Sequence, residues 1–525
     1  MTAKRTVLSL LTVTALALLA FYGLDVRVQA ASTTPDEMDS GVRAVTDAYA
    51  LIEKNFADPV KADRLLYQGA IPGMLGTLDP HSMFLNPAEY ADQQRKQRAQ
   101  YFGVGMLIRM DNGWVTADEP FPGSPAIRAG LRRGDTIVKV DDTDTKGLDT
   151  AKVADLLRGP RGTQVRVSVK RECAPEPITM TVTRGEIQTS QVDGYWLKPG
   201  IAYLGVSTFE AQNVGSDVEA VMKQLGEGSV TGMVLDLRGN PGGLVTEAVK
   251  LAGRFLKDGQ VVVSDHGRAA PEQVLRARGV AAAQDYPMVV MVNRGSASAS
   301  EIVSGALQDH DRAWILGDNT FGKGLVQAQF PLSEGGALLL VIAHYYTPSG
   351  RLIQRDYQNR SFWDYYTHQG DTQPQTDVKT TDSGRKVYGG GGIAPDEKWT
   401  GPRGNTFMAR VARSNALFHF GSVYFCNRTP QLPSATWTPD AAALNQFKTY
   451  LASQQVTFTD EEFDANRKWL TEQLRFELLE RAYDRKTAMR ATIQDDEEVA
   501  KAVDSLPKAQ ALLTRRGPAQ RAALK

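Results

Sequence analysis

The apolar positions divide the chain into segments with different periods. Across 37–100 they recur every three or four residues, which is the period of an amphipathic helix. The apolar positions of this segment are Val42, Val45, Tyr49, Ile52, Phe56, Leu65, Leu66, Ile71, Met74 and Leu75. Pro80 interrupts the pattern and marks a turn. We therefore predict an N-terminal helical segment over 37–100.

Residues 101–187 change to short alternating patterns separated by glycine-rich turns. Period-two alternation is typical of half-buried strands, and the two helical patterns here are short. Strands are predicted at 101–108, 133–141, 165–169 and 178–183, with short helices within 123–131 and at 150–157. The pattern indicates a small β-rich domain.

In residues 199–396, strand patterns and helix patterns alternate. Strands are predicted at 201–206, 233–237, 288–292 and 338–344, and helices at 217–225, 244–256 and 300–308. Alternating units of this kind predict an α/β core in which helices pack on a mainly parallel sheet.

Residues 397–525 are predicted to be mostly helical. Leu470, Leu474 and Leu478 form one face of a charged helix, and helical composition continues over 497–513 before a basic tail at 515–525. Such a tail is more often a solvated end than a binding site. A helical cap, a dimerisation element and a substrate-contacting arm are all compatible with the rest.

The first thirty residues have the pattern of an export signal. Lys4 and Arg5 precede an uncharged stretch from Thr6 to Leu24, and small residues around Ala30 fit a cleavage site. The apolar stretch is also about long enough to span a bilayer. A cleaved signal peptide and an uncleaved membrane anchor at 1–30 therefore both remain open.

Composition narrows the classes of partner and cofactor. The 525 residues include 60 basic and 60 acidic side chains, so net charge does not favour nucleic acid as a partner. The length predicts two to four domains. The six histidines and two cysteines lack metal-ligand spacing, and we expect neither a metal nor a cofactor. Whether Cys173 and Cys426 pair is left open.

Two short runs carry the candidate chemistry. Residues 295–302 crowd hydroxyls among small residues at a predicted helix start, and Lys323 lies alone in an uncharged, glycine-rich segment. A serine needs a neighbouring base to become nucleophilic, and a lysine can be that base only if its surroundings lower its pKa. The runs fit a serine nucleophile with a lysine base, without choosing among Ser296, Ser298 and Ser300.

Each run also has another interpretation. Ser298 and Glu301 have the spacing of a capping box, in which the serine serves only to cap a helix. Gly317, Gly322 and Lys323 imitate a phosphate-binding loop. That imitation fails after the lysine, because Gly324 replaces the hydroxyl residue and a strand pattern replaces the helix that would bind phosphate.

Several motifs, in order, resemble the carboxyl-terminal processing peptidases, or tail-specific proteases, of the S41 serine peptidase family. The 101–187 segment, with G-S-P-A-x-x-A-G-L and R-x-G-D-x-I, is similar to a PDZ domain. The other matching runs lie at 69–75, 78–82, 235–243, 296–302, 321–327, 345–351 and 390–396. The resemblance spans about 40–396 and implies a multidomain α/β protein with a PDZ domain before the peptidase core and helical segments at both ends.

Carried over residue by residue, the resemblance assigns roles to the candidates. It implies Ser298 as nucleophile, Lys323 as general base and Gln327 as the residue that orients the lysine. The N–H groups of Ala299 and Gly242 would form the oxyanion hole, with Gly242 preferred to Gly243. The resemblance to a PDZ domain also implies a loop that binds the terminal carboxylate of a peptide, formed by Gly103, Val104 and Gly105.

The resemblance also implies a setting and partners. The substrates would be exported proteins cleaved near their C-termini, in the bacterial periplasm or at the inner membrane facing it. A homodimer joined through terminal segments is a further expectation. The alternative is an exported PDZ scaffold that binds C-termini without cutting them, and the intact Ser298, Lys323 and Gln327 argue against it.

Overall fold

The computed structural model describes residues 35–98, 100–268, 271–278, 285–358, 362–367, 377–401, 404–426 and 430–515. The predicted signal peptide or anchor at 1–30 and the basic tail beyond residue 515 lie outside these ranges. Within them, no helix has both the length and the apolar character needed to cross a bilayer. The chain divides into two compact units, residues 1–84 with 268–271 and the remainder.

The first unit is helical, as its sequence period predicts. The elements are α2 (Pro35–Asn55), α3 (Ala62–Leu65), the π-helical turn η1 (Leu66–Ala70) and α4 (Ile71–Gly76). Strand β1 (Met83–Leu85) follows. The apolar stripe of α2 is exposed rather than buried: Val42 and Val45 have 60% and 51% of their surface accessible. The segment is therefore helical as predicted, but the apolar side chains of α2 are not buried in a core.

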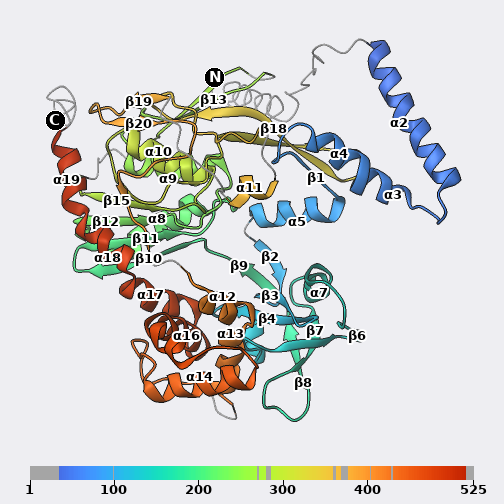
Figure 1. Cartoon of the computed structure of the whole chain (residues 1–525), viewed down its shortest axis with the longest axis vertical. Helices are drawn as coiled ribbons and strands as arrows, with labels where there is room; N and C mark the ends of the chain where they lie inside the picture. Colours follow the sequence, from blue (N-terminus) through green and yellow to red (C-terminus); the bar gives the residue numbers. More distant parts are fainter. Residues whose placement is uncertain are drawn as a thin grey trace, which may run out of the picture. The chain divides into compact units, whose positions relative to one another are not determined.

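The second unit begins with α5 (Pro87–Arg98) and the PDZ-like domain (Figure 1). An antiparallel sheet in the order β3-β4-β5-β7-β8 forms the domain, with β6 paired to β5, and β2 pairs separately with β9. Its elements are β2 (Gln100–Gly103), β3 (Met106–Asp111), β4 (Trp114–Pro120), α6 (Pro125–Ala129), β5 (Thr136–Val140), β6 (Thr143–Asp144), α7 (Thr150–Leu157), β7 (Gln164–Lys170), β8 (Ile178–Thr183) and β9 (Gly185–Gln188). Alternate strand residues such as Val115, Ile137 and Val167 are fully buried, which confirms the predicted β-rich domain.

The α/β core is built on a six-stranded sheet in the order β10-β11-β12-β15-β16-β21. All its strands pair in parallel except β10, which is antiparallel to β11. The strands are β10 (Val192–Lys198), β11 (Ile201–Val206), β12 (Gly232–Asp236), β15 (Met288–Val292), β16 (Trp314–Gly317) and β21 (Glu397–Lys398). The mainly parallel α/β core that the sequence predicts is therefore present.

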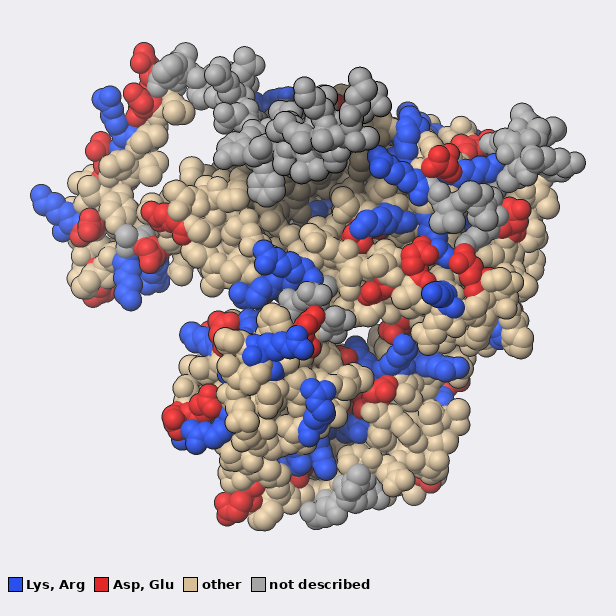
Figure 2. All heavy atoms as spheres, turned by 180° about the vertical axis from the view of Figure 1, so that it is seen from behind, with Lys and Arg blue, Asp and Glu red and all other residues tan. Residues whose placement is uncertain are grey.

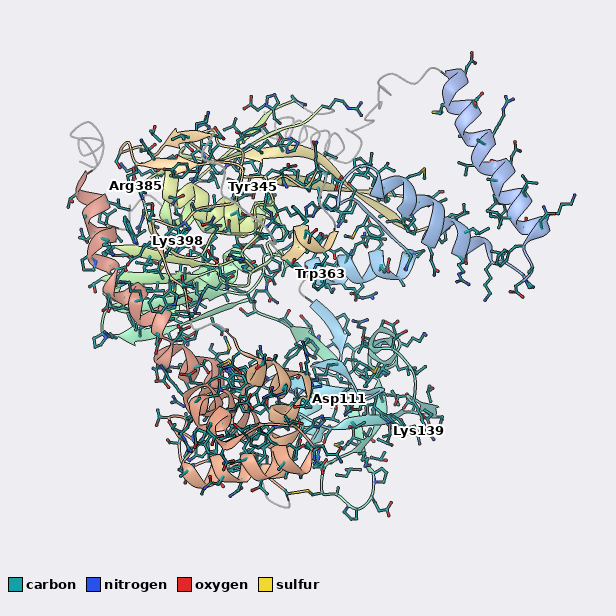
Figure 3. The ribbon with its side chains drawn as sticks, viewed as in Figure 1. Asp111, Lys139, Tyr345, Trp363, Arg385 and Lys398 are labelled. Atoms are coloured by element: carbon teal, nitrogen blue, oxygen red, sulfur yellow. A yellow bond between two sulfur atoms is a disulfide. The ribbon has the colours of Figure 1, made fainter. Side chains whose placement is uncertain are left out.

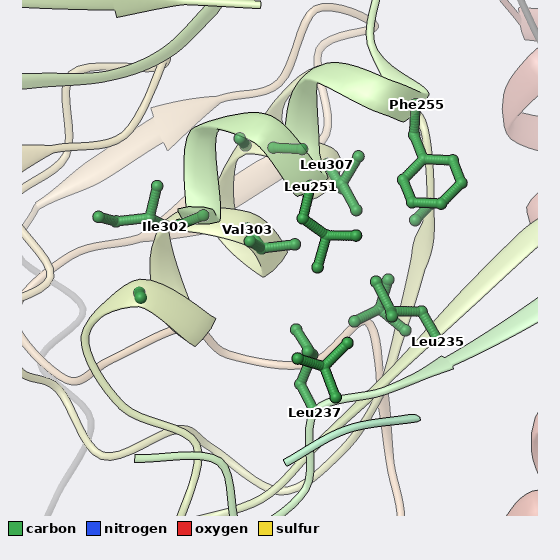
Figure 4. Packing of buried hydrophobic residues seen from close by; sticks show 14 of the residues in the cluster. Leu235, Leu237, Leu251, Phe255, Ile302, Val303 and Leu307 are labelled. Atoms are coloured by element: carbon green, nitrogen blue, oxygen red, sulfur yellow. The ribbon is translucent and has the colours of Figure 1, made fainter. Parts of the chain in front are cut away.

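Three helices cover one face of this sheet. They are α8 (Val214–Leu225), α9 (Val245–Phe255) and α10 (Ala299–Asp309), and a short 3-10 turn, η2 (Glu227–Ser229), follows α8. Leu235 and Leu237 pack against Leu251 of α9 and Val303 of α10 (Figure 4). This packing fixes the start of α10, where Ser298 lies, against the carboxyl end of β12.

A second, antiparallel sheet carries the segment that follows Lys323. It pairs β17 (Leu325–Pro331) with β18 (Ala337–Tyr346), β18 with β13 (Val261–His266), and β13 with β14 (Gln273–Arg276). The predicted strand at 338–344 is thus present, but it belongs to this sheet and not to the parallel one. Beyond it come α11 (Phe362–Thr367), β19 (Val378–Thr380) and β20 (Lys386–Tyr388).

The C-terminal extension is a chain of helices. These are α12 (Thr406–Arg413), α13 (Ala416–Tyr424), α14 (Ala441–Ser453), α15 (Asp460–Ala465), α16 (Arg467–Ala482), α17 (Arg485–Asp495), α18 (Glu497–Asp504) and α19 (Leu506–Arg515). Val499 and Leu506 pack on Val234, Val289 and Met291, whose side chains leave the sheet on the face opposite α9 and α10. Figure 1 shows α18 and α19 running beside the strands of this sheet. Of the three roles left open by the sequence, the structure shows a helical cap.

The extension also contacts the PDZ-like domain. Cys173 and Cys426 form a disulfide between the two, which answers the question that the sequence left open. Asp111 at the end of β3 (Figure 3) accepts a hydrogen bond from Asn415 Nδ2 at 3.2 Å and lies 3.2 Å from His419 Nε2. The domain is therefore held by the extension as well as by its own chain connections.

Surface charge agrees with the balanced composition. On the face drawn in Figure 2, basic and acidic side chains are interspersed. No extended single-sign surface of the kind that steers a polyanion is visible on that face.

Candidate active site

Ser298 lies at the turn between β15 and α10, directly before the first residue of the helix. Its backbone has φ 54° and ψ −112°, a conformation that a non-glycine residue adopts only at a cost of about 1–3 kcal/mol. Small neighbours such as Ala297 and Ala299, both buried, leave room for this turn. The half-buried serine therefore does not have the backbone conformation that is usual for a residue directly before a helix.

The three serines of the run differ in what their hydroxyls do. Ser296 Oγ donates to the Leu237 carbonyl at 2.7 Å, and Ser300 Oγ donates to the Asn240 carbonyl at 2.9 Å. Both of these side chains are fully buried. The Ser298 side chain instead accepts the N–H of Glu301 as one half of a capping box, and among the described residues its hydroxyl is not found as a hydrogen-bond donor. Only Ser298 therefore keeps a hydroxyl proton available for transfer to a base.

Lys323 lies in the loop between β16 and β17. Its Nζ donates to Gln327 Oε1 at 2.6 Å, so the two residues that the sequence pairs by spacing are in contact. Gln327 lies on β17, where the pairing with β18 shifts register between Val326 and Gln327. Such an irregularity re-aims a side chain relative to a regular strand. The hydrogen bond to Gln327 therefore restrains the amino group of the lysine.

Glu301 joins the serine turn to the lysine loop. Its fully buried carboxylate accepts hydrogen bonds from the N–H of Ser298 at 2.8 Å, of Gly322 at 2.7 Å and of Lys323 at 2.9 Å. Thr320 Oγ1 donates to it as well. Burial raises the pKa of Glu301, and the four donors oppose that shift. One side chain therefore sets the relative position of the two predicted catalytic segments.

The sequence pattern had marked Glu301 only as part of a capping box. The Ser298 N–H contact is indeed the carboxylate half of that motif. The contacts to residues 320–323 could not be predicted from local spacing, because they join positions about twenty residues apart. They also exclude the phosphate-loop interpretation: the N–H groups of Gly322 and Lys323 are bound to a carboxylate, and strand β17 follows in place of a helix.

Tyr345 is a further contact to the serine turn that the sequence did not single out. Its hydroxyl donates to the Ser298 carbonyl at 3.0 Å from β18, where Figure 3 labels it. The side chain is almost completely buried, and burial raises the pKa of this phenol. The phenol therefore stays protonated as a donor and holds the carbonyl of the strained residue.

The glycine loop after β12 passes directly against the serine turn. A Cβ on Gly242 would lie 2.8 Å from Ser298 Cβ and 2.9 Å from Ala299 N, and its φ is +97°. Only glycine allows this approach. The Gly242 N–H donates to Asn240 Oδ1 at 2.9 Å, so an oxyanion would compete with that amide for it. Ala299 N–H begins a helix, where no intrahelical acceptor exists.

The predicted carboxylate loop lies between β2 and β3. Gly103, Val104 and Gly105 are buried, and Gly105 has φ +79°, with Ile187 and Ser124 at 2.7 Å from the position of a Cβ. Val104 O accepts the Ala126 N–H at 2.8 Å, which ties the loop to α6. Strand β3 is the terminal strand in its sheet order, so one side of it faces no other strand of that sheet. A peptide could add there as a further strand.

Metal-ligand geometry and one cavity bear on where else a ligand could bind. Within the described ranges, the His, Cys, Asp and Glu side chains form no group of three placed to hold a metal ion. A cavity of about 660 Å³ lies between the PDZ-like domain and the helical extension, lined by Arg133, Phe425 and Arg481 among others. None of its lining residues belongs to the Ser298 turn, the Lys323 loop or the loop at 103–105. It is therefore separate from the candidate active site.

Comparison with known proteins gives the family of this chain. Residues 200–358 match the model of peptidase family S41, and residues 119–171 match that of the PDZ domain. Residues 23–88 match the N-terminal domain of the activating protease CtpB. A carboxy-terminal-processing protease of Bartonella bacilliformis is 39% identical over 298 residues, which cover 56% of this chain and 68% of that protein. The chain belongs to peptidase family S41.

Two further relatives are also named as C-terminal processing proteases. A carboxyl-terminal-processing protease of a Synechocystis species is 37% identical over 58% of the chain and 73% of its own length. CtpB of Bacillus subtilis, a carboxy-terminal processing protease, is 29% identical over 62% of the chain and 68% of its own length. The family resemblance stated from the sequence is confirmed, and the peptidase is a carboxyl-terminal processing serine protease.

Proposed function

We propose that the peptidase cleaves polypeptides near their C-termini with Ser298 as nucleophile and Lys323 as general base. Neutral Lys323 takes the Ser298 proton, and the alkoxide attacks the scissile carbonyl. The protonated lysine then gives its proton to the leaving amine, and water hydrolyses the acyl-enzyme. Gln327 holds the lysine through the 2.6 Å contact to Nζ.

The oxyanion of the tetrahedral intermediate would be bound by backbone N–H groups. Ala299 N–H lies beside the nucleophile, and Gly242 is the residue of the glycine loop that approaches it most closely. For Gly242 to donate, its N–H must turn from Asn240 Oδ1 toward the substrate. Such a donor contributes roughly a hundredfold or more to turnover.

The PDZ domain would bind the substrate tail. The terminal carboxylate would lie at Gly103, Val104 and Gly105, and the preceding residues would extend along the free side of β3. Support comes from the buried, glycine-containing loop and from the terminal position of β3 in the sheet. The substrates would be exported proteins met in the bacterial periplasm, with the segment 1–30 acting as signal or inner-membrane anchor.

A homodimer is a further part of the proposal. The apolar stripe of α2, including Met38, Val42 and Val45, has more than half of each of these residues exposed. An exposed stripe of this kind is covered in many assemblies by a second copy. Sedimentation of the wild type and of a Val42→Glu, Val45→Glu variant tests this: a dimer that becomes a monomer supports it, and a monomeric wild type contradicts it.

The observation that carries the catalytic proposal is the shared carboxylate of Glu301, which accepts the backbone N–H of Ser298 and that of Lys323 and so holds the serine turn against the lysine loop. The test incubates purified protein with an unstructured polypeptide that has an apolar C-terminus. Cleavage should be abolished by Ser298→Ala and by Lys323→Ala. Ser300→Ala is the matched control: it removes a neighbouring hydroxyl that holds the Asn240 carbonyl but takes no part in proton transfer, so cleavage should become slower without being abolished.

The outcomes separate the alternatives. Cleavage that persists in Ser298→Ala or Lys323→Ala contradicts the dyad. A wild type that binds the tail without cutting it under any condition supports the non-catalytic scaffold. Activity should also fall as the pH drops, because a protonated lysine cannot accept the serine proton. A flat pH profile would contradict Lys323 as the base.

A further inference from the structure

We infer that the C-terminal extension positions the oxyanion loop, through an ion-pair cluster centred on Arg238. The inference rests on the proposed function, because it takes the loop at 239–243 as an oxyanion donor. Arg238 is the residue directly before that loop. Its partners come partly from the core and partly from a helix more than 250 residues later in the chain.

The contacts of Arg238 are short and numerous. Its guanidinium donates to Asp236 Oδ2 at 2.7 Å, to Asp496 Oδ2 at 2.8 Å and to Glu498 Oε2 at 2.8 Å. The Arg238 side chain is 17% exposed and that of Asp236 8% exposed, so solvent screens the cluster only weakly. Tyr203 donates its hydroxyl to Asp236 at 3.0 Å. A planar guanidinium held by three carboxylates has little freedom to rotate.

The acidic partners are fixed by helix α18. Asp496 is its N-cap: one carboxylate oxygen accepts the N–H of Glu498 at 2.8 Å, while the other binds Arg238. Val499 and Leu506 then anchor α18 and α19 to the sheet. Since one carboxylate both starts the helix and binds the arginine, the position of Arg238 depends on whether the extension is docked.

The loop beyond Arg238 leads directly to the nucleophile. Gly239 N–H donates to Asn293 Oδ1 at 2.9 Å. The Asn240 carbonyl accepts Ala297 N–H at 3.0 Å and Ser300 Oγ at 2.9 Å, on either side of Ser298. Arg238 is thus the anchor at the start of a loop whose next residues touch the serine turn. A small displacement at that anchor would shift the backbone from which the Gly242 N–H must turn from Asn240 Oδ1 toward the substrate, and oxyanion donors are sensitive to such errors.

The role assigned to Arg238 is therefore that of a positioning residue, not a catalytic one. Removing the two acids of α18 while keeping their shape leaves Arg238 paired with Asp236. The charge stays compensated, so the core should fold. Loss of a donor that acts in the transition state lowers kcat and leaves KM nearly unchanged.

The test compares two double variants of the full-length chain. Asp496→Asn with Glu498→Gln removes the acids that hold Arg238. Lys501→Met with Lys508→Met is the control, because it removes two ion pairs from the same helices to Glu397 on β21, at 2.9 and 2.8 Å. Steady-state cleavage of one polypeptide substrate gives kcat and KM, and thermal unfolding of each variant reports docking.

We expect kcat to fall about tenfold in the acid variant, with KM within twofold and unfolding temperatures similar in the two variants. Both parameters should stay within twofold of the wild type in the control. Arg238→Lys, which keeps the charge but loses the planar fork, should lie between wild type and acid variant in kcat. Equal kcat in the acid variant and the control, or a change in KM alone, overturns the inference.

Two further outcomes are informative. If the acid double variant does not fold, Glu498→Gln alone keeps the Asp496 cap, and it should still lower kcat severalfold; unchanged kcat in that variant overturns the inference. The proposed function is judged separately, because Ser298→Ala must abolish cleavage whether or not the Arg238 cluster affects kcat.

Discussion

The C-terminal extension meets the rest of the second unit at two places of opposite character. On the parallel sheet, α17–α19 pack apolar side chains such as Val499 and Leu506 on buried strand residues. Against the PDZ domain, α13 and α16 present charged groups, including Glu477, Glu480 and Arg481, together with a disulfide. The first contact completes a core, whereas the second is a polar contact that contains titratable side chains and a disulfide.

This difference has a physical basis. Strands buried on both faces, such as β12, need a second apolar layer, and no other described helix group supplies it. The PDZ domain already has its own core of fully buried residues. It can therefore dispense with apolar burial at the extension, and its position there is set by specific polar contacts.

The largest expected effect is on the sheet side. Leu506→Ala should lower the free energy of unfolding by about 2–5 kcal/mol, because it leaves a cavity against the sheet where Leu506 is only 6% exposed. Chemical denaturation measures the change. Leu506→Met, which conserves volume, should cost less than about 1.5 kcal/mol. Equal stability of the alanine variant and the wild type would mean that the extension is not a core layer.

The next effect is on the PDZ side, at the disulfide. Cys173→Ser with Cys426→Ser should lower stability by about 2–4 kcal/mol, since the bond closes a loop with a sequence separation of 253. Thermal unfolding with and without reductant measures it. Reductant should destabilise the wild type and leave the serine variant unchanged. Cleavage of a short peptide should persist, because neither cysteine contacts the Ser298 turn.

A smaller effect should appear as a pH dependence of the same contact. Burial raises the pKa of Glu480 from 4.5 to about 7, although Arg133 and Arg485 oppose the shift, while Glu477 and Glu119 add to it. The folded state then holds a proton that the unfolded state has lost between these values. Stability from this group is therefore present at low pH and is lost as pH rises toward 7, by at most about 1.4 kcal/mol per pH unit.

Glu480→Gln tests that dependence directly. The variant should be more stable than the wild type at pH 8 and similar to it near pH 4.5, because glutamine stays neutral throughout. Melting temperatures measured at both pH values give the comparison. A wild type and variant whose difference does not change with pH would show that Glu480 does not titrate in this range.

The smallest expected effect concerns Phe418 of α13. Three guanidinium groups lie over its ring, those of Arg109 at 4.0 Å, Arg133 at 4.8 Å and Arg481 at 5.1 Å. Phe418→Leu keeps an apolar side chain but removes the π face, and should cost about 1 kcal/mol. A double-mutant cycle with Arg109→Met isolates the pair. A coupling energy of zero would mean that these cations only lie near the ring.

The N-terminal helix and the catalytic turn show how far local patterns reach. The spacing of Val42, Val45 and Ile52 predicted helix α2 correctly, but it did not indicate that these side chains would be exposed. The Ser298–Glu301 spacing predicted a helix start, which α10 confirms. Hydrophobic periodicity predicts which residues lie on the same face of a helix or strand. It does not predict whether that face packs on the core, on another chain or against solvent.

The sequence by itself determined the element types, the order of the domains and the family, since each depends on periods or motifs within short windows. It also marked Ser298, Lys323 and Gln327 as candidates. Only the tertiary structure decided that the cysteines pair, that Glu301 joins the serine turn to the lysine loop, and that α18 reaches Arg238 across a separation of 258 residues. Such contacts depend on how distant elements pack, and no local pattern in a single sequence encodes that packing.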